Sequence, residues 1–205
     1  AISADLFAAN NTTPIVSNHA IDWINNNIKI KSYTGIIQKL TLNPIQEEYI
    51  KKLQNPDTTM LKLSVDRQVG YTTATAAYIV YKMIHETNYN TLIVSAINDQ
   101  SNYIRDMITY MYLNIPISEN QNINAYFSRT NAEFVHNDSK YNRNTILYST
   151  PNNCSVTCRS YSLQLAVLQE YEYYNIDIPI SEWMFGIRCS LSTRGVCAAY
   201  SYPKV

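Results

Sequence analysis

Charged residues are scarce in this sequence, and neither sign is in surplus. They make up 16% of the chain, and the formal net charge is zero. About a quarter of the residues of a globular protein are usually charged, and a dedicated DNA-binding domain usually shows a basic surplus or a basic face. The charge balance therefore indicates that any contact with DNA uses a small surface or is made through partner proteins.

Long apolar runs and an export signal are also missing. No stretch of about 18 apolar residues occurs, so no membrane span is expected. Residues 1–10 have no basic segment ahead of their short apolar run, which argues against a secretory signal. These absences predict a cytoplasmic protein, and the reducing cytoplasm keeps thiols free.

The cysteines allow two interpretations. A Cys-x3-Cys pair with two further cysteines is a candidate zinc site, although the spacing is poor for a zinc ribbon. Buried reduced thiols are the favoured interpretation, and zinc is the alternative. The four residues are Cys154, Cys158, Cys189 and Cys197.

Hydrophobic periodicity predicts alternating strands and helices from residue 43 onward. Asn43 is a suitable helix cap and Pro44 suits a first turn. Ile45, Tyr49 and Leu53 then fall on one face of that helix.

One alternating segment and several short apolar runs predict the strands of a sheet. The alternating segment lies at 59–65 and the apolar runs at 90–96, 163–170 and 186–192, and the segment 121–150 reads as short strands and turns. Two amphipathic helices lie between them, the second capped by Asn98 or Asp99. Their apolar stripes are Ala76, Ile79, Val80, Met83 and Ile84, and Ile104, Met107, Ile108, Met111 and Tyr112. We predict an α/β fold with a mostly parallel sheet flanked by helices.

The loop after the first predicted strand is where an open α/β sheet binds ligands. A phosphate-binding loop needs converging backbone N–H groups, a Lys for the phosphates and a Ser or Thr for Mg²⁺. Gly70 and Thr72 are in register with that pattern, but Tyr71 stands at the Lys position and the first Gly is absent. On this pattern alone, an ordinary strand-to-helix turn is the alternative.

The segment 66–73, Asp-Arg-Gln-Val-Gly-Tyr-Thr-Thr, resembles the Walker A loop of viral terminase large subunits. That variant reads Arg-Gln-hydrophobic-Gly-Lys-Thr-Thr and lacks the first glycine. Three further segments resemble the family in the same order, so the likeness covers about 40–202. They are the adenine-reading segment at 42–46, the lead into the Walker B strand at 159–170, and the Ser/Thr-rich coupling motif at 190–193.

The resemblance implies a P-loop ATPase fold and a role for each matching residue. Arg67 matches an arginine finger in cis, Glu170 matches the base that polarises the attacking water, and Gln46 matches the adenine reader. Thr72 matches the hydroxyl ligand of Mg²⁺, while Gln169 replaces the metal-binding Asp. The remaining nucleotide-binding positions would be Gln68, Gly70, Tyr71 and Thr73.

Tyr71 and Gln169 remove a cation from the phosphates and an anion from the metal. Phosphoryl transfer depends on positioning and charge, so binding of ATP and Mg²⁺ should be weakened and hydrolysis largely lost. The sequence therefore indicates a pseudo-ATPase that serves as a binding or structural module. A partner that supplies the missing Lys in trans and a helicase-type ATPase fragment are the alternatives.

The same resemblance implies domain organisation and partners. Residues 1–40 are expected to be an N-terminal appendage and 41–205 the ATPase-like domain, with no nuclease domain and hence no DNA cleavage. Protein partners from a portal-like or motor-like assembly are expected, with double-stranded DNA as a further partner. The 18 tyrosines favour a protein interface over base stacking because the net charge is zero. A host cytoplasmic or virion-associated location follows.

Overall fold

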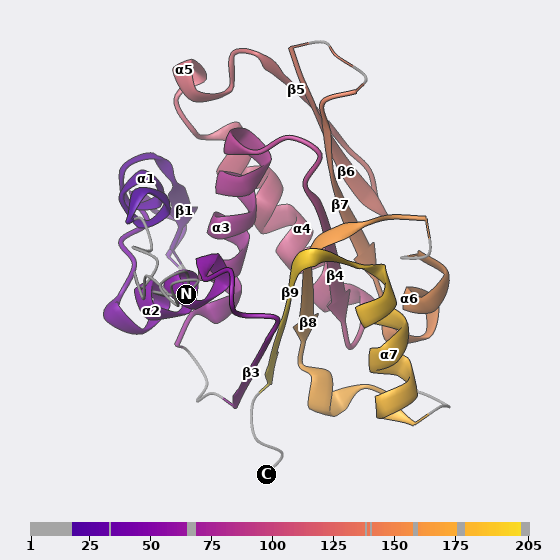
Figure 1. Ribbon diagram of the computed structural model, residues 1–205. Coiled ribbons are helices and arrows are strands. Elements are labelled where there is room, and N and C mark those ends of the chain that lie inside the picture. The colour runs from indigo at the N-terminus through magenta and orange to yellow at the C-terminus, as the bar shows by residue number, and fades with distance from the viewer. Residues whose placement is uncertain are drawn as a thin grey trace, which may run out of the picture.

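A mostly parallel sheet forms the centre of the molecule. The computed structural model describes residues 18–32, 34–64, 69–137, 139, 141–157, 160–175 and 179–201. The strands are β3 (Met60–Ser64), β4 (Asn90–Ser95), β5 (Ile123–Phe127), β6 (Asn131–His136), β7 (Arg143–Ser149), β8 (Leu163–Gln169) and β9 (Leu191–Ser201). They lie in the order β3-β9-β8-β4-β7-β6-β5 (Figure 1). Each neighbouring pair from β3 to β7 in this order is parallel, whereas β6 pairs antiparallel with both β7 and β5.

Helices cover both faces of the sheet (Figure 1). On one face lie α1 (His19–Asn27), α2 (Pro44–Gln54), α3 (Tyr71–His85) and α4 (Asn98–Leu113); on the other lie α6 (Pro151–Thr157) and α7 (Ile180–Ser190). Side chains along β4 alternate between the two layers, with Ile93 in one apolar cluster and Leu92 and Val94 in the other. The predicted α/β sheet flanked by helices is confirmed.

Three of the four predicted strands are confirmed, as β3, β4 and β8. Strands β4 and β8 are buried on both faces, as expected for parallel strands between two helical layers. The segment 121–150 does contain short strands, β5 to β7.

The fourth predicted strand, at 186–192, is wrong. The helix α7 occupies this segment up to Ser190, and β9 begins only at Leu191. Trp183 and Ile187, one helical turn apart, are the buried face of α7. A short apolar run fits a buried strand and a buried helix equally well, which explains the error.

Helix α2 begins as predicted, but one face residue is wrong. The Asn43 side chain accepts a hydrogen bond from the Gln46 N–H, and the Gln46 side chain accepts one from the Asn43 N–H, which makes a capping box. Tyr49 and Leu53 are buried, whereas Ile45 is 53% exposed and Gln46 is buried instead.

Helices α3 and α4 follow their predicted stripes. Ala76, Ile79, Val80 and Met83 are fully buried, and Ile84 packs against the same core. The predicted cap of α4 is wrong, because the cap position is Ile97 and no side chain caps this end. Among the described residues, no helix is long and apolar enough to cross a bilayer.

The described part of the predicted appendage packs on the domain. The strands β1 (Lys29–Lys31) and β2 (Ile37–Lys39) form a small antiparallel sheet, and α1 precedes it. Ala20, Trp23 and Ile24 are buried in the same cluster as α2 and α3. The domain boundary at residue 40 stays a prediction.

The described cysteines differ in how exposed they are. Cys154 and Cys197 are buried, reduced cysteines, as predicted, but Cys189 is exposed on α7, so its predicted burial is wrong. Cys158 lies outside the described residues. Within the described ranges, no group of three or more His, Cys, Asp or Glu side chains is placed to hold a metal ion.

Candidate functional site

The carboxyl ends of β8 and β4 meet the first turn of α3 at one edge of the sheet. A cavity of about 280 Å³ lies there, lined by Thr72, Asp99, Gln100, Tyr103, Gln169 and Glu170. The fold thus brings three predicted site residues, Thr72, Gln169 and Glu170, to one cavity. This edge is where open α/β sheets bind their ligands.

The loop before α3 turns at Gly70. Its φ is +82°, in the left-handed region that favours glycine, and it precedes the first residue of α3. The first N–H groups of a helix have no partner within the helix, so those of residues 71–73 are available to an anion. Thr73 lies in this first turn and is partly exposed. Arg67 and Gln68 lie outside the described residues.

Gln46 is tied into this loop rather than free to meet a base. Its Nε2 donates to the carbonyl oxygens of Val69 and Gly70, at 3.0 and 3.2 Å, and its Oε1 accepts from the Asn43 N–H at 3.0 Å. The side chain is 7% exposed. Gln46 therefore fixes the loop in the structure, and its adenine-reading role stays a prediction.

Tyr71, at the position of the phosphate-binding Lys, turns toward the core. Its ring lies edge-on to Tyr49, with centroids 4.9 Å apart, and stacks on Tyr200 at 6.3 Å. Burial raises the pKa of Tyr71 above its usual 10, so the hydroxyl is neutral near pH 7. The residue supplies packing between α2, α3 and β9, and no positive charge.

A chain of hydrogen bonds crosses the ends of the central strands. Ser95 Oγ donates to Gln169 Oε1 at 2.8 Å, and Gln169 Nε2 donates to the Tyr200 hydroxyl at 2.8 Å. The Tyr200 hydroxyl donates in turn to Thr72 Oγ1 at 3.4 Å. The two positions predicted to handle Mg²⁺, Thr72 and Gln169, are therefore joined through Tyr200.

This chain is buried and carries no charge. Ser95, Gln169 and Tyr200 are exposed by 0, 4 and 3%. Burial raises the pKa of Tyr200 to about 12, so its hydroxyl keeps its proton near pH 7. Each link joins one donor to one acceptor, which is the arrangement that buried polar groups require.

Glu170 stands where the catalytic base was predicted, directly after β8. Its φ is +53°, uncommon for a residue with a side chain, and its N–H donates to the Tyr200 carbonyl at 2.8 Å. The side chain is partly exposed and lines the cavity. The backbone bond to β9 holds this turn, so the carboxylate is presented at the sheet edge.

The Thr72 and Gln169 positions lack the carboxylate that would help to hold Mg²⁺ in an intact site. Gly70 turns the backbone at the start of α3, whose first N–H groups have no partner within the helix. The metal position offers a buried amide in place of a carboxylate, and both ends of that amide are hydrogen-bonded. Among the described residues, the charged side chains lining the cavity are Asp99 and Glu170, both negative.

Sequence reasoning missed Ser95 and Tyr200. Ser95 ends β4, and Tyr200 lies near the end of β9, so both were detectable as polar residues at strand ends. The error in placing β9 hid Tyr200, because a strand ending at 192 leaves residue 200 outside the sheet. Gln100 and Tyr103 were missed because they reach the cavity from α4.

The predicted coupling motif at 190–193 is also misplaced. Leu191 pairs with Leu163, the first residue of β8, so the segment lies at the amino end of β9. Ser192 lines a different cavity of about 540 Å³ together with Arg194 and Gln164. The segment therefore lies at the opposite edge of the sheet from Thr72.

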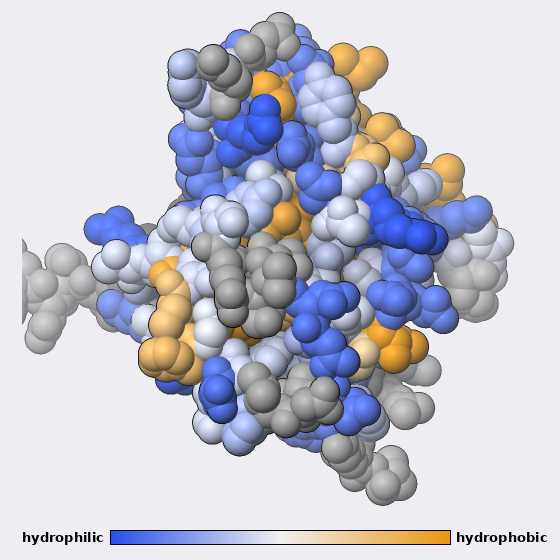
Figure 2. Space-filling model, turned by 90° about the vertical axis from the view of Figure 1, so that its right-hand side faces the viewer, coloured by the Kyte–Doolittle hydropathy of each residue, from blue (hydrophilic) through white to orange (hydrophobic). Residues whose placement is uncertain are grey.

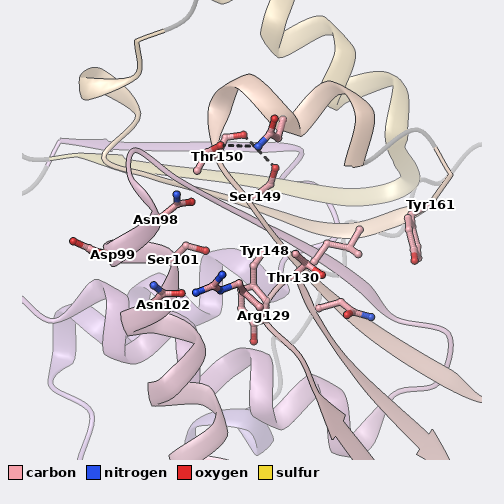
Figure 3. Close-up of a pocket in the computed structure, with 13 residues that line it drawn as sticks. Asn98, Asp99, Ser101, Asn102, Arg129, Thr130, Tyr148, Ser149, Thr150 and Tyr161 are labelled. Carbon is pink, nitrogen blue, oxygen red and sulfur yellow. Dashed lines mark hydrogen bonds between the residues drawn. The ribbon is translucent and has the colours of Figure 1, made fainter.

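A larger cavity lies on another face of the first turn of α4 (Figure 3). Its volume is about 710 Å³, and Arg129 approaches Ser101 and Asn102 there in Figure 3. Tyr148 also lines it, and its buried hydroxyl has no hydrogen-bond partner in the described part of the chain. Asp99 lines both cavities, so this polar hollow adjoins the candidate site.

Comparison with known proteins gives a likeness in fold alone. No protein-family model matches the sequence, and no curated protein sequence matches it. The ATPase domain of the Thermus phage P74-26 large terminase matches with a TM-score of 0.57 and 17% identity, over 71% of this chain and 60% of that one. The large terminase of bacteriophage HK97 matches with a TM-score of 0.68 and 16% identity, over 89% of this chain and 36% of that one.

A cellular protein has a similar fold. S. cerevisiae Dbp5, in a complex that contains ADP, matches with a TM-score of 0.53 and 12% identity, over 79% of this chain and 42% of that one. The chain thus spans less than two thirds of the length of each of these proteins. With this parallel sheet and these matches, the chain has a fold similar to that of phage large-terminase ATPase domains.

Proposed function

We propose that this chain is a terminase-type ATPase module that has lost hydrolysis and acts as a binding or structural part of a viral DNA-packaging assembly. The observation that carries this proposal is Tyr71. The residue that should reach the phosphates instead packs its ring against Tyr49 and Tyr200.

The loss of charge at this site should cost much of the transition-state stabilisation for hydrolysis. Charge that develops on a transferring phosphoryl group is stabilised by fixed cations, and each lost stabilising group costs several kcal/mol of transition-state stabilisation. Tyr71 provides a neutral hydroxyl, and Gln169 provides a neutral amide. Among the described residues that line the cavity, Asp99 and Glu170 are negative and oppose a polyphosphate.

Retained parts of the site support descent from an ATPase. Thr72 and Glu170 line the same cavity, and Gly70 keeps the left-handed turn before α3. A polyphosphate chain would meet the N-terminus of α3, and we expect ATP to bind weakly there. Mg²⁺ would supply charge neutralisation in an intact site, but the Gln169 amide, hydrogen-bonded at both ends, does not offer it a carboxylate.

Protein partners remain the better supported class, with a portal-like or motor-like assembly first and DNA second. Exposed tyrosines such as Tyr103, Tyr126 and Tyr141 offer aromatic contact area without charge. Figure 2 shows that hydrophobic side chains on the face bearing α6 and α7 form small separate groups among hydrophilic ones. That pattern argues against a large apolar interface on this face.

Two alternatives keep a nucleotide-driven function. A partner could supply a Lys in trans, which the retained Thr72 and Glu170 favour. A helicase-type ATPase fragment is the other alternative, since Dbp5 was solved in a complex with ADP and has a similar fold. The likeness in fold is greater to the HK97 terminase than to Dbp5, which favours the terminase-type module.

Hydrolysis by the purified chain tests the proposal. We expect ATP turnover barely above background, and we expect Tyr71→Lys with Gln169→Asp to raise it by about 10²-fold, more than either change alone. Phosphate release over time is the measurement, with Glu170→Gln in the double variant as the control that should abolish the gain. Turnover of about 1 per second or more by the unmodified chain would refute the proposal. Turnover that appears only with a partner would support the trans alternative.

A further inference from the structure

The hydroxyl of Tyr200 lies between the two positions that the family resemblance assigns to Mg²⁺. It is 3.4 Å from Thr72 Oγ1 and 2.8 Å from Gln169 Nε2. One protein atom therefore joins the predicted hydroxyl ligand to the position of the missing carboxylate. Tyr200 is 3% exposed and its ring stacks on Tyr71, so it belongs to the folded core.

The directions of these hydrogen bonds disfavour a cation between Thr72 and Gln169. Ser95 donates to Gln169, Gln169 donates to Tyr200, and Tyr200 donates to Thr72. A cation entering between Thr72 and Gln169 would meet an amide N–H and a hydroxyl proton, whereas Mg²⁺ requires oxygen lone pairs in a near-octahedral arrangement. The donors already point into the space that a metal ligand would have to face.

Burial makes rearrangement expensive. Metal entry would break the Gln169–Tyr200 and Tyr200–Thr72 bonds and leave buried polar groups without partners. The charge would enter a region where Ser95 and Gln169 are almost fully buried, with no carboxylate in the chain of bonds to compensate it. We therefore expect the neutral chain to be favoured over a metal-bound arrangement of the same residues.

We propose that the Tyr200 hydroxyl takes the place of the divalent cation between Thr72 and Gln169, so that these two positions do not hold Mg²⁺. This proposal rests on the proposed function, in which the site no longer hydrolyses ATP. The Tyr200 hydroxyl donates to Thr72 Oγ1 and so helps to orient that side chain. Tyr200 acts here as a positioning residue, through Thr72.

Asp99 and Glu170 offer another explanation if a divalent cation binds the protein or strengthens nucleotide binding. Both line the cavity, and a carboxylate pair can attract a divalent cation to a position outside the Tyr200 chain. The variant Asp99→Asn therefore separates weak attraction by these carboxylates from binding at Thr72 and Gln169.

Melting shifts with ADP and ATP, measured in EDTA and in Mg²⁺, test the proposal. For the unmodified chain we expect the same nucleotide affinity in both conditions, within about twofold. For Gln169→Asp combined with Tyr200→Phe, we expect Mg²⁺ to strengthen nucleotide binding by about tenfold or more. Tyr200→Phe alone is the matched control, since it removes the hydroxyl and keeps the ring, and it should remain indifferent to Mg²⁺.

Binding of Mn²⁺ to the protein, measured by electron paramagnetic resonance, tests the proposal if no nucleotide binds. The combined variant should then bind Mn²⁺ about tenfold more tightly than the unmodified chain. Equal Mn²⁺ binding would overturn the proposal, as would a Mg²⁺-dependent nucleotide affinity of the unmodified chain that Asp99→Asn does not remove. Turnover by the unmodified chain would refute the proposed function, whereas Mg²⁺-dependent binding without turnover would refute only the role of Tyr200.

Discussion

Gly70 controls the geometry of the candidate phosphate cradle. Its left-handed φ of +82° sets the turn before α3, and a Cβ atom there would collide with the side-chain amide of Gln46. Gln46 in turn holds the Val69 and Gly70 carbonyls. A single residue without a side chain therefore permits both the turn and the bond that fixes it.

Replacement of Gly70 by alanine should destabilise the protein. We expect Gly70→Ala to lower the free energy of unfolding by about 1–3 kcal/mol, because a Cβ strains the left-handed backbone and displaces Gln46. Urea unfolding followed by circular dichroism measures this change.

Gly186 provides the matched control. It lies inside α7, and a Cβ added there meets nothing within 4 Å. Gly186→Ala should raise the free energy of unfolding by about 0.5–1 kcal/mol, because alanine favours the helix. Equal effects of the two substitutions would contradict the assigned role of Gly70.

The contact of α1 with α3 is a cluster of aromatic rings and two histidines. His85 lies edge-on to Trp23 at 5.0 Å and to His19 at 5.5 Å, and its Nδ1 donates to the Tyr81 carbonyl at 2.9 Å. Trp23 Nε1 donates to Glu119 at 2.8 Å. This cluster attaches residues 19–27 to the domain.

Acid should weaken this contact. Burial lowers the pKa of His85 below its usual 6.5, and nearby His19 lowers it further. The unfolded chain then binds the proton more tightly than the folded one, so the free energy of unfolding should fall as the pH drops through about 6.5 and below. Urea unfolding at pH values between about 7 and 5, monitored by tryptophan fluorescence, measures this dependence.

His85→Gln isolates the contribution of this imidazole. The variant keeps a polar side chain that cannot titrate, so its stability should change less over the same pH interval. Parallel pH profiles for the variant and the unmodified chain would assign the effect to other groups, such as Glu119 or Glu86, which face the cluster.

At the scale of the whole molecule, β9 is held between β3 and β8, and Cys197 lies on it. The Cys197 thiol is 1% exposed, and burial raises its pKa to about 12. Its neighbours on both sides are parallel strands, so β9 becomes accessible only when the sheet opens.

Thiol labelling therefore reports opening of the sheet. We expect maleimide to modify Cys189, exposed on α7, at least about 10³-fold faster than Cys197 in native buffer. Peptide mapping by mass spectrometry distinguishes the two sites. Labelling of Cys197 should accelerate with urea as the chain unfolds, and equal native rates at both sites would contradict the central position of β9.

The sequence by itself determined the α/β class and much of the strand order along the chain. Apolar runs and helical stripes are local patterns, so β3, β4, β8, α3 and α4 could be predicted from them. The motif order also predicted that Thr72, Gln169 and Glu170 would meet, because parallel strands carry their carboxyl ends to one edge. The strand and helix predictions depend on patterns among residues that are close together in the sequence.

Only the tertiary structure decided how those residues are used. The end of α7 at Ser190 and the start of β9 depend on packing between distant segments, so a local pattern misassigned 186–192. The link from Gln169 through Tyr200 to Thr72 joins three elements, and no sequence spacing encodes such a contact. The sequence indicated neutral residues at positions 71 and 169, whereas the fold placed the buried Tyr200 hydroxyl between Gln169 and Thr72.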